Sequence, residues 1–336
     1  MQFFKSGGLL IYQLMQLNPG TLRQKIRAAP AGNRRQLISA LFIRDAALLA
    51  FAVAYIGLFS LWFGADNGYV GVASFCILLS ARFVNYDYNV HASLLTLVLV
   101  FGLMGLNGWL LPLLPAVGGF MINALSLLLI LRLTSHQPLF GNGGVYTFAY
   151  LLVTNMPASL GSRWAALGVA LSGCGLVFWL HHHDQHTDVA LWQIIRIRDW
   201  HHPTWHWQLR LALGVASAVL VGQLLYVPRV MWLGFACMSL LLPTSYQLRT
   251  RAVYRLSGVV IGSLLFSACV YVLPQPLVSI LAPLAGFGLG LTPSYLLASI
   301  FNCFGALSVA HTLFGPLPAA ELRIFNNGVG ILIALL

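Results

Sequence analysis

The feature that most constrains this chain is a succession of long apolar runs separated by short polar segments. Only 7% of its 336 residues are charged, whereas a soluble domain usually carries about 25%. So few charged residues are not enough to form the surface of a protein of this length in water. A lipid bilayer is therefore its expected environment. Several runs approach the roughly 20 apolar residues that a helix needs to cross the hydrocarbon core. The sequence therefore predicts an all-α, polytopic membrane protein with the lipid bilayer as its first partner.

The apolar runs predict about twelve transmembrane helices. We expect them near 45–63, 68–82, 90–108, 113–132, 144–160, 164–181, 208–227, 230–244, 253–273, 277–291, 294–314 and 320–336. The chain then divides into four parts: a basic cytoplasmic or interfacial segment (1–44), a first transmembrane set (45–181), a His/Trp-rich cytoplasmic link (182–207) and a second transmembrane set (208–336).

The net charge of +11 lies in short segments between the apolar runs. This pattern is typical of topology signals, so we expect no nucleic-acid partner. The basic N-terminus should be cytoplasmic, with both chain ends on the same side of the membrane. Arg163, Arg229 and Arg323 fall on the opposite side and depart from a strict positive-inside rule.

The two transmembrane sets resemble each other. Residues 68–79 ("GYVGVASFCILL") correspond to 230–241 ("VMWLGFACMSLL"), and 144–155 ("GVYTFAYLLVTN") correspond to 293–304 ("PSYLLASIFNCF"). With about six spans in each set, the repeats are parallel and related by an axis along the membrane normal. Transport proteins built in this way place their pathway at the interface of the repeats.

The stretch from His181 to Gln208, which includes the central link, holds seven of the ten histidines. His182 and His186, and likewise His202 and His206, are spaced so that each pair would share a helix face. They are weak metal candidates, and they support an alternative function as a membrane di-metal oxidase or hydroxylase. Pro203 disfavours a helix at His202, however, and the tryptophans of the link suit a segment at the membrane surface. No nucleotide-binding loop, nucleophile elbow or zinc-protease motif occurs, so we expect no cofactor and no enzyme.

Polar residues inside apolar runs are candidates for a pathway or for helix contacts. A single buried asparagine such as Asn123 is more typical of an interhelical hydrogen bond, and the Gly258/Gly262 pair is typical of close helix packing. The sequence contains no ATP-binding motif, so uphill transport would need an ion gradient. Asp45 and His311 are the candidate proton-binding residues. Arg251 and Arg255 share a helix face. They either anchor the cytoplasmic side or concentrate carboxylates at a channel mouth.

At Pro228–Leu265, "PRVMWLGFACMSLLLPTSYQLRTRAVYRLSGVVIGSLL", the chain resembles the fusaric acid resistance/aromatic acid exporter family. Arg251, Arg255, Gly258 and Gly262 carry the resemblance, and Val259 replaces the usual threonine. Tyr295 and the closing "RIFNNGVG" (323–330) look like later family positions. The resemblance implies an inner-membrane exporter of aromatic or other organic carboxylates that works with a periplasmic adaptor protein. Relatives include malate-conducting anion channels.

We therefore expect a transporter of small organic anions, most simply an efflux protein. Arg251, Arg255 and Arg323 would attract the anion, while Tyr295, Asn302 and Asn327 would offer hydrogen-bonding groups. An anion channel and a membrane scaffold remain alternatives. The sequence leaves a homo-oligomer open.

Overall fold

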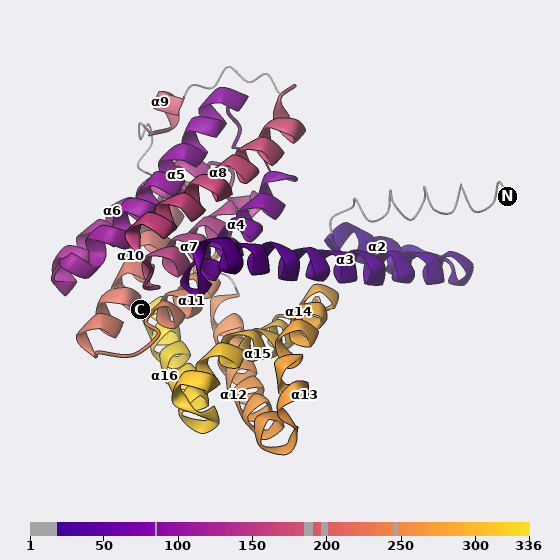
Figure 1. The fold of residues 1–336 in the computed structure, drawn as a ribbon. Helices are drawn as coiled ribbons and strands as arrows, with labels where there is room; N and C mark the ends of the chain where they lie inside the picture. Colours follow the sequence, from indigo (N-terminus) through magenta and orange to yellow (C-terminus); the bar gives the residue numbers. More distant parts are fainter. Residues whose placement is uncertain (1–18, 85, 185–190, 196–200, 245–246) are drawn as a thin grey trace. The chain divides into compact units, whose positions relative to one another are not determined.

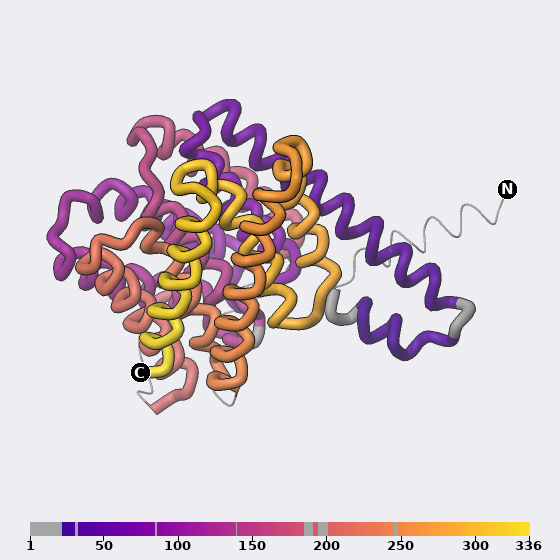
Figure 2. The backbone as a smooth tube through the Cα atoms, turned by 90° about the horizontal axis from the view of Figure 1, so that it is seen from below, coloured from indigo at the N-terminus to yellow at the C-terminus, as the bar shows by residue number. Residues whose placement is uncertain are grey.

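The computed structural model describes residues 19–336 apart from 85, 185–190, 196–200 and 245–246. Every regular element in this part of the chain is a helix, and the trace between the helices contains no strand (Figures 1 and 2). The all-α prediction is confirmed.

The predicted spans coincide with helices, although their lengths differ. The α-helices are α2 (Pro19–Ala28), α3 (Ala31–Phe63), α4 (Gly68–Ala81), α5 (Val90–Leu110), α6 (Ala116–Thr134), α7 (Asn142–Thr154), α8 (Leu160–His182), α9 (Leu191–Ile195), α10 (Pro203–Leu224), α11 (Met231–Leu240), α12 (Leu248–Val272), α13 (Gln275–Ser279), α14 (Leu281–Leu291), α15 (Tyr295–Phe314) and α16 (Pro316–Leu335). Three short 3-10 turns, η1 (Ala65–Asn67), η2 (Leu111–Leu113) and η3 (Pro138–Phe140), lie between them.

Within the described residues, seven helices are long and apolar enough to cross a membrane. They lie in α3, α5, α6, α8, α10, α12 and α15. The helices α4, α7 and α11 are shorter; α7, with 13 residues, spans about 20 Å, against about 30 Å for the hydrocarbon core. The protein is thus multi-pass, and its arrangement as about twelve spans in two parallel repeats stays a prediction.

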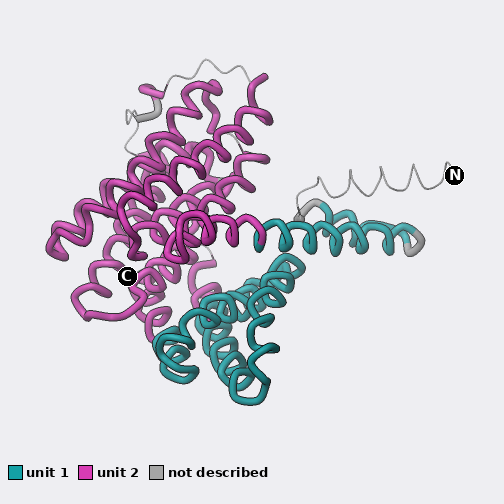
Figure 3. The backbone as a smooth tube through the Cα atoms, in the orientation of Figure 1, with its two compact units in different colours: residues 1–53, 254–324 teal, residues 54–253, 325–336 magenta. Residues whose placement is uncertain are grey.

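The contacts divide the chain into two compact units (Figure 3). Unit 1 comprises residues 1–53 and 254–324, and unit 2 comprises residues 54–253 and 325–336. Each unit therefore contains segments that are far apart in the sequence. The boundaries between the units fall inside α3, α12 and α16, so each of these helices contributes to both units.

The core of unit 2 is built around α7, which packs against α4, α5, α6 and α11. Ten of its 13 residues are buried, and four of them form a polar series at helical spacing: Asn142, Tyr146, Tyr150 and Thr154. A helix buried on all sides is expected to be apolar all round. The polar series therefore needs partners inside the unit. Asn142 and Tyr150 find them on α4, α5 and α6, while Tyr146 bonds a residue between α4 and α5 and Thr154 bonds the backbone of its own helix.

Candidate functional site: a cationic cavity in unit 2

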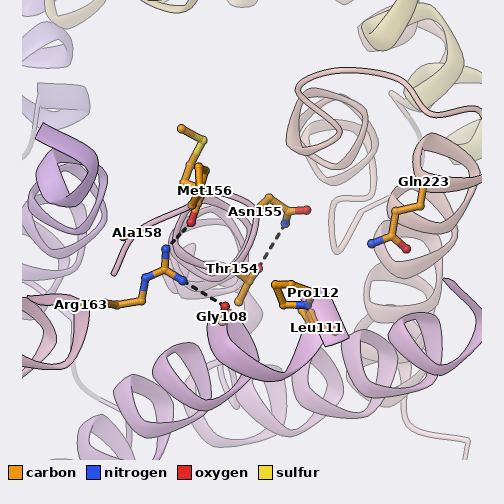
Figure 4. Close-up of a pocket in the computed structure, with 10 residues that line it drawn as sticks. Gly108, Leu111, Pro112, Thr154, Asn155, Met156, Ala158, Arg163 and Gln223 are labelled. Carbon is orange, nitrogen blue, oxygen red and sulfur yellow. Dashed lines mark hydrogen bonds between the residues drawn. The ribbon is translucent and has the colours of Figure 1, made fainter. Parts of the chain in front are cut away.

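A cavity of about 400 Å³ lies in unit 2 where α5, α7 and α10 end and α8 begins (Figure 4). Its polar lining comes from Thr154, Asn155, Arg163 and Gln223, and its apolar lining includes Leu111, Pro112, Met156 and Pro157. One charged side chain, several neutral polar groups and an apolar wall are the usual composition of a small-molecule site.

Arg163 supplies the positive charge of the cavity. It lies on the first turn of α8 and is only 5% exposed. Its Nη1 donates to the carbonyl oxygen of Gly108 at 3.1 Å, and its Nη2 donates to the carbonyl oxygen of Met156. A side chain at position 108 would meet the guanidinium, since an added Cβ would lie 2.7 Å from Nη1. The absence of a side chain at Gly108 thus leaves the space that the Arg163 guanidinium occupies.

The acceptors of Arg163 are neutral, so they orient the guanidinium without cancelling its charge. Asp66 on η1 interacts with it electrostatically, but Asp66 is exposed, and no carboxylate in the described chain forms an ion pair with Arg163. A guanidinium has five N–H donors, and two bonds are made here. A buried cation without an ionic partner is costly, which favours an anionic ligand.

Two amides reach the cavity from different helices. Asn155 follows α7, and its Nδ2 donates to the Leu151 carbonyl oxygen at 3.0 Å and to Thr154 Oγ1 at 3.2 Å. Gln223 comes from α10 on the other side of the cavity (Figure 4). Its Oε1 is buried and has no hydrogen-bond partner among the residues that the structure describes. These groups can hold polar parts of a ligand beside the arginine.

A second arginine lies next to the cavity wall. Arg229 Nη1 lies 3.4 Å from the hydroxyl of Tyr69 and 3.6 Å from Sδ of Met156, so Met156 contacts two guanidinium groups. Arg229 has a left-handed backbone (φ 57°), which is rare for a non-glycine residue. Asn326 of α16 stabilises this turn by donating Nδ2 to the carbonyl oxygens of Pro228 at 2.9 Å and Arg229 at 3.3 Å.

A hydrogen-bonded cluster lies one turn further into α7. The Tyr150 hydroxyl donates to Asn123 Oδ1 at 2.8 Å and accepts from Asn107 Nδ2 at 3.0 Å. Asn107 Nδ2 also donates to Ser126 Oγ at 2.7 Å. These bonds join α5, α6 and α7 at residues that adjoin Gly108 and lie one helical turn before Thr154, both of which line the cavity. Sequence reasoning identified Asn123 but missed Tyr150 and Asn107.

The structure distributes the six predicted path residues over both units. Unit 1 holds Arg255, Tyr295, Asn302 and Arg323, and unit 2 holds Arg251 and Asn327. Arg255 and Arg323 are buried and interact electrostatically, and Arg323 also contacts Cys303. Asn302 is exposed on α15 and Tyr295 is half-buried. In unit 2, Arg251 donates to the Ser239 carbonyl oxygen at 3.2 Å, and Asn327 is fully buried. Their roles in a pathway stay predictions.

Two of the four candidate metal ligands, His182 and His202, make structural contacts. His182 Nε2 lies 2.7 Å from the carbonyl oxygen of Ala81, and His202 Nδ1 accepts from the Thr204 amide at 3.3 Å. His206 is exposed on α10, and His186 lies outside the described residues. Among the residues that are described, no three His, Cys, Asp or Glu side chains could hold a metal ion.

The long apolar helices and the cationic cavity between them are those of a multi-pass membrane protein. Residues 215–336 match the sequence model of a family described as fusaric acid resistance protein-like. The match confirms the predicted family resemblance for this part of the chain. Most of the cavity-lining residues precede the matched segment. Comparisons with curated proteins and with solved structures found no match.

Proposed function

We propose that the protein exports organic carboxylates, aromatic acids among them, across the cell inner membrane, and that the Arg163 cavity binds the carboxylate. The supporting observation is a buried guanidinium that lies beside a cavity and whose hydrogen bonds, within the described chain, go to neutral carbonyl oxygens. The planar fork of an arginine matches the two oxygens of a carboxylate. An apolar wall that includes Leu111, Pro112 and Met156 suits the hydrocarbon part of such an acid.

In this proposal the remaining arginines have a supporting role. Arg251, Arg255 and Arg323 raise the local concentration of anions by electrostatic attraction, with Tyr295, Asn302 and Asn327 as hydrogen-bonding groups. The N-terminus is cytoplasmic, and the protein acts as a transporter and not as an enzyme, without a cofactor. Assembly with a periplasmic adaptor protein, or into a homo-oligomer, belongs to the same proposal.

The test is transport of phthalate, an aromatic dicarboxylate, by the purified full chain in liposomes. We expect Arg163→Gln to lower the transport rate by about tenfold or more, because loss of a buried charge contact costs roughly 2 kcal/mol or more. Arg163→Lys keeps the charge but not the fork, so it should retain an intermediate rate. Arg210→Gln is the matched control, because Arg210 also donates to one carbonyl oxygen but is exposed.

The melting temperature of each variant separates loss of transport from loss of folding. If folded Arg163→Gln transports phthalate at the wild-type rate, the cavity is not the binding site. If the wild-type protein moves none of a panel of aromatic and aliphatic carboxylates, the proposed function is wrong.

A further inference from the structure

Asp45 is the only acidic residue within the seven membrane-crossing helices of the described chain. It lies in the α3 span and is 5% exposed. A carboxylate at such a position is costly and usually marks a functional site. The contacts of Asp45 within unit 1 indicate what that function is.

Two arginines from different helices hold the charge of Asp45. Its Oδ1 pairs with Arg44 Nη1 at 3.0 Å, and Arg23 of α2 also attracts it electrostatically. Arg23 in turn donates to the carbonyl oxygen of Gly290 on α14. The two arginines are the charged groups that face Asp45, because α14 carries no titratable side chain. We call this set of four residues, Arg23, Arg44, Asp45 and Gly290, the α2–α3–α14 clasp.

Glycines allow α3 to approach α14 at this point. A Cβ at Gly290 would lie 3.0 Å from Cγ and Oδ2 of Asp45, and a Cβ at Gly286 would lie 3.4 Å from Leu49 Cδ1. One helical turn before Asp45, the rings of Phe42 and Phe287 are in edge contact at 5.8 Å. The carboxylate is therefore set directly against the backbone of α14.

The second oxygen of the carboxylate is in a different situation from the first. Oδ2 is buried and has no hydrogen-bond partner among the described residues. It faces Gly290, which lies in the last turn of α14 because that helix ends at Leu291. The C-terminal end of a helix carries partial negative charge, which disfavours a carboxylate and favours the neutral acid. The two arginines thus favour the charged carboxylate of Asp45, while the end of α14 favours its neutral, protonated form.

We propose that Asp45 is a proton-binding site whose occupation opens the α2–α3–α14 clasp and couples transport to a proton gradient. A proton from water adds to Oδ2 and later leaves the same oxygen to water, so no other bond changes over a cycle. The neutral acid no longer attracts Arg44 and Arg23, so α2 loses this electrostatic contact while it keeps the bond from Arg23 to Gly290 and the packing of the buried Leu22. This inference rests on the proposed transport function.

The experiment compares the wild type with Asp45→Asn, which fixes the neutral form, in liposomes loaded with phthalate. We expect Asp45→Asn to exchange internal for external phthalate at close to the wild-type rate, but to lose the acceleration that an imposed pH gradient gives the wild type. Glu321→Gln is the control, because Glu321 is an exposed acid of the same unit and should follow the gradient normally.

A second measurement tests the clasp without transport. Trypsin cleaves after Lys25 and Arg27, which are exposed on α2. If protonation releases α2, Asp45→Asn should be cleaved about threefold faster or more at neutral pH, because proteolysis follows local opening, while Glu321→Gln keeps the wild-type rate.

An Asp45→Asn protein that still follows the pH gradient, or is cleaved at the wild-type rate, overturns this inference and leaves the proposed function intact. A wild-type protein that exchanges no organic anion overturns the proposed function and, with it, the coupling role of Asp45.

Discussion

Two helix contacts, one in each unit, are made by different means. In unit 1, α12 meets α15 through glycines: added Cβ atoms at Gly258 and Gly262 would lie 2.8 Å from the carbonyl oxygens of Leu296 and Ile300. In unit 2, α5, α6 and α7 are joined by hydrogen bonds that converge on Tyr150. Helices in lipid lack a strong hydrophobic drive to associate, and close backbone approach and polar bonds are two ways to replace it.

The difference has a functional consequence. The contact of α12 with α15 leaves no room for a ligand, because the backbones themselves touch. The α5–α6–α7 contact needs buried amides and hydroxyls, and these groups lie close in the chain to Gly108 and Thr154, which line the Arg163 cavity. Polar packing can therefore stabilise unit 2 and support its site at once, while the glycine contact between α12 and α15 stabilises the fold without forming a site.

The largest effect is expected when a side chain replaces one of the glycines between α12 and α15. Gly262→Leu would place a side chain within 2.9 Å of Ile300 Cα and 2.8 Å of its carbonyl oxygen, and backbone atoms do not move aside. We expect no folded protein to be recovered in size-exclusion chromatography. Gly305→Leu on α15 is the control, because nothing lies within 4 Å of its added Cβ. A folded, monodisperse Gly262→Leu protein would contradict the close approach of α12 and α15.

A smaller effect is expected from breaking the polar contact. Tyr150→Phe removes one hydroxyl and leaves the Asn123 and Asn107 amides without that partner. The free energy of unfolding should fall by about 1–2 kcal/mol, since buried groups left unpaired cost about 1–3 kcal/mol and interhelical bonds in membranes average about 0.6 kcal/mol. Equilibrium unfolding in detergent measures this change.

Tyr254→Phe is the control for this substitution. Tyr254 is 47% exposed on α12, so loss of its hydroxyl should leave the free energy of unfolding unchanged. Equal stability of both variants would mean that the Tyr150 cluster does not hold α5, α6 and α7 together.

Sequence reasoning predicted the glycine contact and only part of the polar one. Gly258 and Gly262 carry a spacing that signals close packing wherever it occurs in an apolar helix. Asn123 is conspicuous for a similar reason, because an amide stands out in an apolar run. Tyr150 does not stand out, since its hydroxyl sits on an otherwise apolar ring, and Asn107 lies in a segment that the sequence assigns to a span end.

The cavity could be predicted even less. Arg163 and Arg229 were noticed as exceptions to the positive-inside rule, but their binding partners were not. The carbonyl oxygens of Gly108 and Met156 orient Arg163, and every residue has such an oxygen, so no sequence pattern marks them. The division into two units could not be predicted either. Helical periodicity locates α3, α12 and α16, but it does not show that each of them contributes to both units.

The smallest effect at neutral pH is expected at Tyr86, which extends the polar packing of unit 2. Its hydroxyl is hydrogen-bonded to that of Tyr146 on α7. Burial, followed by the nearby Tyr146, raises the pKa of Tyr86 well above its usual value. The folded state thus binds a proton that the unfolded chain releases near pH 10. This contribution to stability is complete below about pH 10 and is lost as the pH rises further.

Alkaline pH can therefore separate the two kinds of packing. Tyr86→Phe should cost less than about 1 kcal/mol at pH 7, and above pH 10 it should lose less stability than the wild type, because it has one fewer buried phenol to ionise. Tyr254→Phe is again the control, because Tyr254 is 47% exposed on α12. Unfolding curves between pH 7 and 11 make the comparison. A curve for Tyr86→Phe that runs parallel to the wild type would show that ionisation of this phenol does not limit the polar packing of unit 2.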